Sequence, residues 1–156
     1  MSAQVIYDTA PLGALIRYSD GASKPPLRFR KKVAAWERNN GVGRLVRKQA
    51  QRNRPNFSAP ATITLHEGDF GSGGVVVLTV MRTYDLNSSL SFEIVERPAI
   101  GMGRVLRNWG GCPELVHLAA NREAAERWLA SKCDPSLRLE EVAEDEIAIG
   151  ASERSA

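Results

Sequence analysis

The stretch VVVLTVMR, which runs from Val75 to Arg82, decides the fold that the sequence predicts. It is almost entirely apolar and rich in β-branched residues, a composition typical of a strand that is buried on both faces. We therefore predict that residues 75–80 lie in the middle of a sheet. The other predicted elements are arranged around this strand.

The segments next to this stretch alternate apolar and polar residues, as half-buried strands do. They are residues 61–66 and residues 90–96. The glycine-rich connection 67–74 and the turn 85–89 join the three strands into an antiparallel meander. Further strands are predicted at residues 4–7, 12–18, 42–46, 103–109 and 114–118, with an edge strand within residues 137–149.

Two segments have the spacing of an amphipathic helix. Residues 27–39 place Phe29, Val33 and Trp36 on one stripe, with lysine and arginine on the remaining surface. Residues 121–132 begin with an asparagine, which favours the N-cap position, and continue with a second apolar stripe. We expect the first helix to lay its stripe on the sheet.

The polar, proline-containing segments 19–26 and 49–60 are predicted loops, and the second is long enough to be mobile. Together, these elements predict the α+β class, with a mainly antiparallel twisted sheet of about five to seven strands and two amphipathic helices. The length of 156 residues matches one globular domain, which we place at residues 1–150, followed by a frayed tail at residues 151–156.

The composition argues against several classes of protein. The chain is 43% hydrophobic and 25% charged, close to the globular average, so disorder over its whole length is not expected. Its longest apolar run, Val75 to Leu78, is far shorter than the roughly 18 residues of a membrane span, and the first residues lack a targeting signal. Two cysteines, Cys112 and Cys133, are too few for a disulfide framework. We expect a cytoplasmic protein with free thiols.

The charges are segregated along the chain, although the formal net charge is only +3. The segment from Lys24 to Arg54 holds eleven basic residues and a single acid, Glu37. The segment from Asp134 to Glu153 reverses the balance, with seven acids and one base. Such a separation of charge favours contact with a charged partner.

The basic segment leads to the first functional hypothesis, a small nucleic-acid-binding accessory protein whose partner is DNA or RNA. Lysine and arginine side chains neutralise phosphates and release counterions, and aromatic rings such as Trp36 and Phe57 can stack on bases. No helix-turn-helix, zinc-finger, RNP or GXXG motif accompanies the basic segment. The candidate phosphate-binding residues are Arg28, Lys31, Lys32, Arg38, Arg47, Lys48, Arg52 and Arg54.

Two other interpretations of the charges stay open. The basic helix can be an ordinary solvated surface, with Trp36 in the core. Alternatively, the protein is a non-enzymatic interaction module, such as an inhibitor or adaptor, that docks a protein of opposite charge through its basic face or its acidic tail. The Ala- and Arg-rich composition is typical of a bacterium with GC-rich DNA, and an accessory protein of a plasmid or phage would suit either function.

An enzyme is the third hypothesis, and it has the weakest support. The neighbours His66, Glu67 and Asp69 could provide a base and an orienting acid, and Cys112 with His117 could provide a thiolate and a base. Neither set has the spacing of a known catalytic or metal-binding motif, and the glycines of residues 68–74 do not follow the order of a phosphate-binding loop. We therefore assign no catalytic residue, no metal site and no cofactor.

Overall fold

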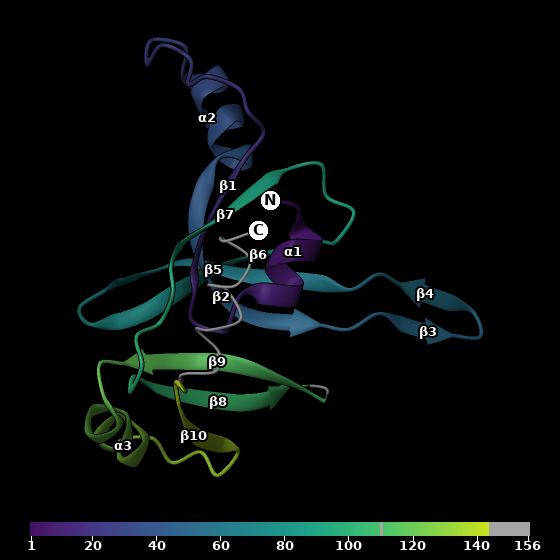
Figure 1. Cartoon of the computed structure of the whole chain (residues 1–156). Helices are drawn as coiled ribbons and strands as arrows, with labels where there is room; N and C mark the ends of the chain where they lie inside the picture. Colours follow the sequence, from purple (N-terminus) through teal and green to yellow (C-terminus); the bar gives the residue numbers. More distant parts are fainter. Residues whose placement is uncertain (110, 144–156) are drawn as a thin grey trace.

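The computed structural model describes residues 1–109 and 111–143 (Figure 1). In chain order, its elements are α1 (Ala3–Thr9), β1 (Leu15–Ser19), α2 (Arg30–Asn39), β2 (Gly41–Gln49), β3 (Arg52–Arg54), β4 (Phe57–Ala59), β5 (Thr62–Ser72), β6 (Val75–Asp85), β7 (Ser91–Glu96), β8 (Gly103–Trp109), β9 (Cys112–Ala119), α3 (Arg122–Ala130) and β10 (Leu137–Glu141). No helix among the described residues is long and apolar enough to cross a membrane.

The predicted α+β class is wrong, because sheet dominates the molecule. Eight strands form one antiparallel sheet in the order β10-β8-β9-β2-β1-β7, with β5 paired to β2 and β6 paired to β5, while β3 and β4 form a separate ribbon. The described residues contain three helices, of 7, 10 and 9 residues. None of the three is long enough to form a layer that covers the sheet.

Strand β2 is the centre of the sheet because it pairs with three other strands. Residues 41–44 pair with β1, residues 44–49 pair with β5, and Arg47 pairs with Glu114 of β9. A register shift between Leu45 and Arg47 marks a bulge, which bends a strand. The lobe made of β8, β9, α3 and β10 thus joins the rest of the sheet at the bulged part of β2, below it in Figure 1.

The predicted strand at residues 4–7 is wrong, since these residues belong to helix α1. Val5, Ile6 and Tyr7 favour strands, but the Ser2 side chain accepts a hydrogen bond from the amide of Val5 and caps the helix. Ala3, Ile6 and Ala10 then form one buried stripe against the core of the sheet. Tertiary packing therefore overrides the local strand preference.

The elements of the C-terminal lobe agree closely with those predicted from the sequence. Strand β8 has the predicted bounds, and Asn121 caps α3 by accepting a hydrogen bond from the amide of Ala124 at 2.8 Å. Helix α3 approaches β8 at Gly103, where an added Cβ would lie 2.5 Å from the Cβ of Ala125. The predicted edge strand is confirmed at β10, while residues 144–149 and the tail at 151–156 lie outside the described residues.

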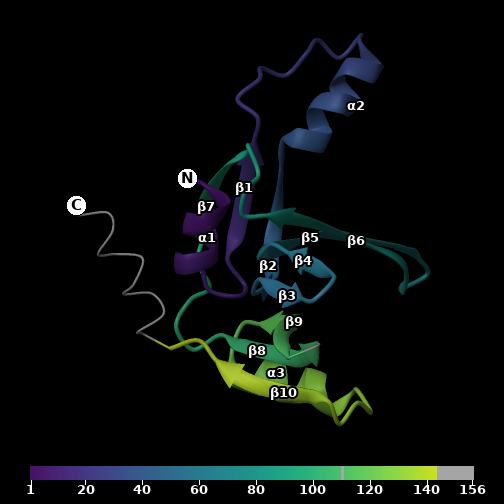
Figure 2. The ribbon, with the colours of Figure 1, turned by 90° about the vertical axis from the view of Figure 1, so that its right-hand side faces the viewer.

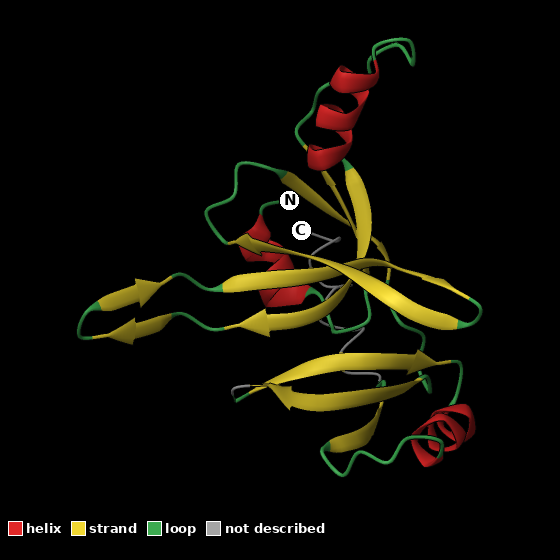
Figure 3. Ribbon diagram, turned by 180° about the vertical axis from the view of Figure 1, so that it is seen from behind, coloured by secondary structure: helices red, strands yellow, loops and turns green. Residues whose placement is uncertain are grey.

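The central prediction about residues 75–80 is also wrong, because β6 lies at an edge of the described sheet, where it pairs with β5 alone. Strand β5 continues through the predicted glycine-rich connection as far as Ser72, and only Gly73 and Gly74 make the turn, with φ of 63° and 79°. The end of the β5–β6 hairpin therefore extends away from the body of the protein (Figures 1 and 3). The most apolar stretch of the chain lies in this extension.

A second extension occupies the predicted loop 49–60. Strands β3 and β4 pair there from Arg52 with Ala59 to Arg54 with Phe57, so the segment is a ribbon rather than an irregular loop. It continues the β2–β5 pair and points away from the β5–β6 turn, toward the opposite side of the molecule (Figures 1 and 3).

Candidate nucleic-acid interface

Residues 20–40 form a projection at the end of the β1–β2 pair, which we call the α2 projection (Figures 1 and 2). The last residue pair of β1 and β2 before it is Tyr18 with Gly41. The chain leaves the sheet there, forms a loop over residues 20–29 and returns through helix α2. The amphipathic helix predicted from the sequence is confirmed, but it stands beyond the end of the sheet and does not lie on its face.

Polar side chains hold the base of the projection. The Asn40 side chain donates hydrogen bonds to Asp20 Oδ1 at 3.0 Å and to the Trp36 carbonyl at 2.8 Å, and it accepts one from the Ser19 hydroxyl at 2.7 Å. Hydrogen bonds from the Ala22 amide, and then from Asn40, lower the pKa of the Asp20 carboxyl below its ordinary value. The two ends of the projection are thus tied to each other.

The apolar stripe of α2 packs on its own loop. The indole Nε1 of Trp36 donates to the Ala22 carbonyl at 2.7 Å, and the Lys24 ammonium lies 5.7 Å from the centre of the indole ring. Val33 is buried, Trp36 is half-buried and Phe29 is exposed. The projection therefore has a small internal core, which leaves its outer surface to the basic side chains.

Several basic side chains lie at the N-terminal end of α2, which is the positive end of the helix dipole. The first turn is Arg30, Lys31 and Lys32, with no acidic residue, and within the described chain Phe29 makes no side-chain hydrogen bond that caps the helix. The helix dipole already places about half a positive charge there, so three cations destabilise the turn. Arg28 adds a fourth, with its guanidinium 4.8 Å from the centre of the Phe29 ring.

The structure divides the eight predicted phosphate-binding residues into three places. Arg28, Lys31, Lys32 and Arg38 are exposed on the α2 projection, where Lys24 and Arg30 join them. Arg47 and Lys48 are half-buried in β2, within the body of the protein. Arg52 and Arg54 are exposed on the β3–β4 ribbon, where Phe57 is exposed as well. The clearest cluster is therefore at the N-terminal end of α2.

The neighbours His66, Glu67 and Asp69 are divided between two faces of the sheet. His66 Nε2 and Thr79 Oγ1 each lie 2.9 Å from Asp69 Oδ1, and these contacts lower the pKa of Asp69. Glu67 lies at a bulge and instead accepts a hydrogen bond from the Tyr18 hydroxyl and pairs with Arg82 at 3.1 Å. The three side chains therefore do not form one site.

His66, Asp69 and Thr79 line a cavity of about 400 Å³ between the β5–β6 hairpin and strands β8 and β9. From the other side, Arg107, Glu114 and His117 line it. Many of these polar groups already have protein partners, such as Asp69 with His66 and Arg107 with Asp134. Within residues 1–109 and 111–143, no group of three or more His, Cys, Asp or Glu side chains is placed to hold a metal ion.

Cys112 and His117 do not form a nucleophile and base pair. Cys112 begins β9 and pairs with Trp109 in register, whereas His117 is five residues further along the strand, about 17 Å at the rise of an extended chain. The imidazole stacks on the Trp128 indole with 4.5 Å between ring centres and an interplanar angle of 2°. Burial, and then the charge of Lys132, lower the pKa of His117. Its role is thus in the packing of α3 on β9.

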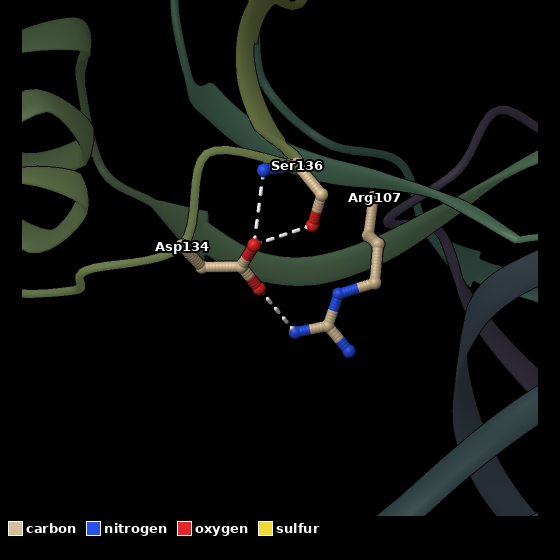
Figure 4. A network of polar contacts seen from close by, with 3 residues as sticks. All are labelled: Arg107, Asp134 and Ser136. Atoms are coloured by element: carbon tan, nitrogen blue, oxygen red, sulfur yellow. Dashed lines mark hydrogen bonds and ion pairs between the residues drawn. The ribbon is translucent and has the colours of Figure 1, made fainter.

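The described part of the acidic tail pairs within the C-terminal lobe and not with the α2 projection. Asp134 accepts hydrogen bonds from the amide and hydroxyl of Ser136, and it forms an ion pair with Arg107 at 3.1 Å (Figure 4). Glu140 pairs with Arg104 at 2.8 Å in the same way. These acids therefore leave the basic surface of α2 open.

No curated protein and no solved structure matches this chain. A family model does match, over residues 1–146, and the chain belongs to that family, which is described as uncharacterised conserved protein UCP036055.

Proposed function

We propose that the protein binds nucleic acid, with the α2 projection as the principal contact for phosphates. One observation carries the proposal: in the described chain, four exposed bases lie at a helix N-terminus that has no capping side chain and no acid in its first turn. They are Arg28, Arg30, Lys31 and Lys32.

The energetics of the helix support this choice of ligand. Cations at the positive end of a helix dipole each cost about 0.3–1 kcal/mol at an exposed site. An anion at this end reverses the sign of the interaction, because it meets the free amides, the dipole and the basic side chains at once. Phosphates of DNA or RNA supply such anions in a regular row.

The β3–β4 ribbon provides a second contact, through Arg52, Arg54 and the exposed ring of Phe57. The nine residues of β2, about 30 Å at the rise of a strand, and the ten residues of α2, about 15 Å at the rise of a helix, separate it from the N-terminal end of α2. A single strand of duplex DNA carries a phosphate every 3.4 Å or so. The two basic groups would thus contact phosphates several nucleotides apart and hold the nucleic acid along β2.

A protein ligand is the second candidate, favoured by one observation. Leu27 is 74% exposed at the tip of the projection, beside Arg28. An acidic segment with an apolar anchor would fit this pairing of charge and apolar surface. In either case, the proposal includes a cytoplasmic location and a role as a bacterial accessory protein of a plasmid or phage.

Fluorescence anisotropy with labelled single- and double-stranded oligonucleotides, at about 50 and about 200 mM salt, tests the proposal. We expect micromolar or tighter binding at the lower salt and a drop in affinity of orders of magnitude at the higher salt. Absence of binding at the lower salt would contradict the proposal and favour the acidic protein ligand, which a pull-down after nuclease treatment would then recover.

A further inference from the structure

Exposed apolar side chains gather at the end of the β5–β6 hairpin. We call residues 68–80 the apolar arm. On it, five large side chains are more than half exposed: Phe70 (59%), Val75 (65%), Val76 (58%), Val77 (77%) and Leu78 (57%). The arm extends from the body of the protein (Figures 1 and 3). Because successive residues of a strand point to opposite faces, the exposed run 75–78 places apolar side chains on both faces of the arm.

This exposure conflicts with the composition of the strand. A run of β-branched and apolar residues is typical of a strand covered on both faces and paired on both edges. In the described chain, β6 pairs with β5 alone, so the backbone groups along its other edge have no strand partner there. A long, apolar edge of this kind pairs readily with another strand. The composition of β6 is therefore more typical of a strand that pairs with another strand on its open edge than of an exposed edge strand.

We infer that β6 pairs with β6 of a second copy of this chain, antiparallel and about a two-fold axis. Such a pair is self-complementary, because the same residues on both copies form the interface. No residue from Val75 to Met81 is charged, so the pairing brings no like charges together and buries no unpaired charge. The eight-stranded sheets of the two copies would become continuous.

The exposed side chains of β6 lie along the edge that this pairing would use. Val75, Val76, Val77, Leu78 and Met81 are 44–77% exposed and follow one another along the strand. Edge pairing brings the flanks of such side chains together, at about 0.2–1 kcal/mol for each cross-strand pair, and leaves their outward faces open. The interface therefore stays below about 1,200 Å², the size of weak and reversible associations.

A lipid surface is a poorer occupant for the same arm. Hydrocarbon offers no hydrogen-bond partner, and each unsatisfied backbone group costs several kcal/mol there. The open edge of β6 would carry that penalty into the bilayer. A second β6 instead satisfies the backbone edge and brings the apolar side chains of the two copies into contact along it.

A dimer would also present two α2 projections on one assembly. Two linked binding surfaces raise the effective affinity for a polyanion without any new interaction in either copy. This consequence is additional, since the pairing of β6 does not require nucleic acid.

Sedimentation equilibrium of the protein alone, from about 1 to about 100 μM, tests the inference over the range in which such interfaces associate. We expect twice the chain mass at the higher concentrations. Leu78→Lys, which puts like charges near the two-fold axis, should raise the dissociation constant at least tenfold. Val95→Lys, on the exposed edge strand β7, is the matched control and should leave it unchanged.

Hydrogen exchange provides a readout that does not depend on any variant. In the wild-type protein, the amides of residues 75–81 should exchange more slowly as the concentration rises, because pairing protects the edge. A chain that remains a monomer up to 100 μM or so, with exchange independent of concentration, would overturn the inference. A Leu78→Lys protein that dimerises as well as Val95→Lys would do so too.

Discussion

The indole nitrogen of Trp36 donates a hydrogen bond to the carbonyl oxygen of Ala22 across 2.7 Å. This bond joins helix α2 to the loop that precedes it, at a distance of fourteen residues along the chain. Because α2 stands beyond the end of the sheet, interactions of this kind within the projection fix how its basic side chains are presented. The proposed interface thus depends on a small local core as well as on charge.

Trp36→Phe should loosen the projection without unfolding the protein. The variant keeps an aromatic ring over the loop but removes the donor, which leaves the Ala22 carbonyl without this bond at a cost of about 1 kcal/mol. Hydrogen exchange followed by mass spectrometry should show faster exchange in residues 30–39, with the exchange of β1 and β2 unchanged. Unaltered protection of α2 would contradict the role assigned to this hydrogen bond.

Lys31→Glu should strengthen helix α2 while it weakens nucleic-acid binding. An acid in the first turn replaces a repulsive interaction with the helix dipole by an attractive one. Removing the cation and adding the anion each stabilise the helix by about 0.3–1 kcal/mol. Arg38→Glu, in the last turn, is the matched control: it changes the net charge equally but weakens the helix. Amide exchange of α2 should therefore slow in the first variant and speed up in the second. The same direction in both would contradict the dipole argument.

Tyr18 should make the protein sensitive to alkaline pH. Burial, and then its hydrogen bond to Glu67, raise the pKa of the phenol above its ordinary value. The phenol ionises near pH 10 in the unfolded chain and only at higher pH in the folded chain, so the stabilising contribution is complete below pH 10 or so and is lost as the pH rises above it.

Denaturant titrations at about pH 8 to 11 measure this effect. In the wild-type protein, this group should lower the free energy of unfolding by up to about 1.4 kcal/mol for each pH unit above 10. The free energy of unfolding of the Tyr18→Phe variant should fall less steeply over that range, although the variant is less stable than the wild-type protein at neutral pH. Parallel pH profiles for the two proteins would rule out a contribution from Tyr18.

Gly103→Ala should destabilise the C-terminal lobe. A Cβ at this position would lie 2.5 Å from the Cβ of Ala125, so α3 must move away from β8, at a cost of about 1–3 kcal/mol. Gly68→Ala is the control, since its nearest neighbour would be the Phe70 ring at 3.8 Å. Thermal unfolding should show a lower midpoint for the first variant only. Equal midpoints would mean that the lobe adapts without cost.

Local signals in the sequence predicted the elements whose ends are marked by specific side chains. Asn121 caps α3, and the apolar spacing of Phe29, Val33 and Trp36 marks α2. The helix at residues 3–9 was missed because Val5, Ile6 and Tyr7 resemble a strand, and the cap at Ser2 is a short-range signal that their strand preference obscured. Burial of Ile6 against the sheet decides the outcome, and no local pattern contains that contact.

The two larger errors concern where elements lie and not what they are. Residues 75–80 do form a strand, as predicted. Their apolar composition indicates burial, but it carries no information on whether the residues that bury the strand belong to the same chain. The basic segment 24–54 was treated as one surface. Strand β2 passes through it and carries Arg47 and Lys48 into the body of the protein, which leaves the α2 projection and the β3–β4 ribbon as separate basic sites.

The most direct test of the account compares the salt dependence of nucleic-acid binding in two variants of equal charge. One replaces Arg30, Lys31 and Lys32 by Gln, and the other replaces the exposed bases Arg127, Lys132 and Arg138 of the C-terminal lobe by Gln. Both bring the formal net charge from +3 to zero, so a difference between them reports the placement of charge.

On duplex DNA, each phosphate that the protein neutralises contributes about 0.9 to the slope of the logarithm of the binding constant against the logarithm of the salt concentration. We expect the α2 variant to bind more weakly and its slope to be smaller in magnitude by up to about 2.7, while the C-terminal variant keeps the slope of the wild-type protein. Equal slopes and equal affinities in the two variants would contradict the claim that the N-terminal end of α2 binds phosphates.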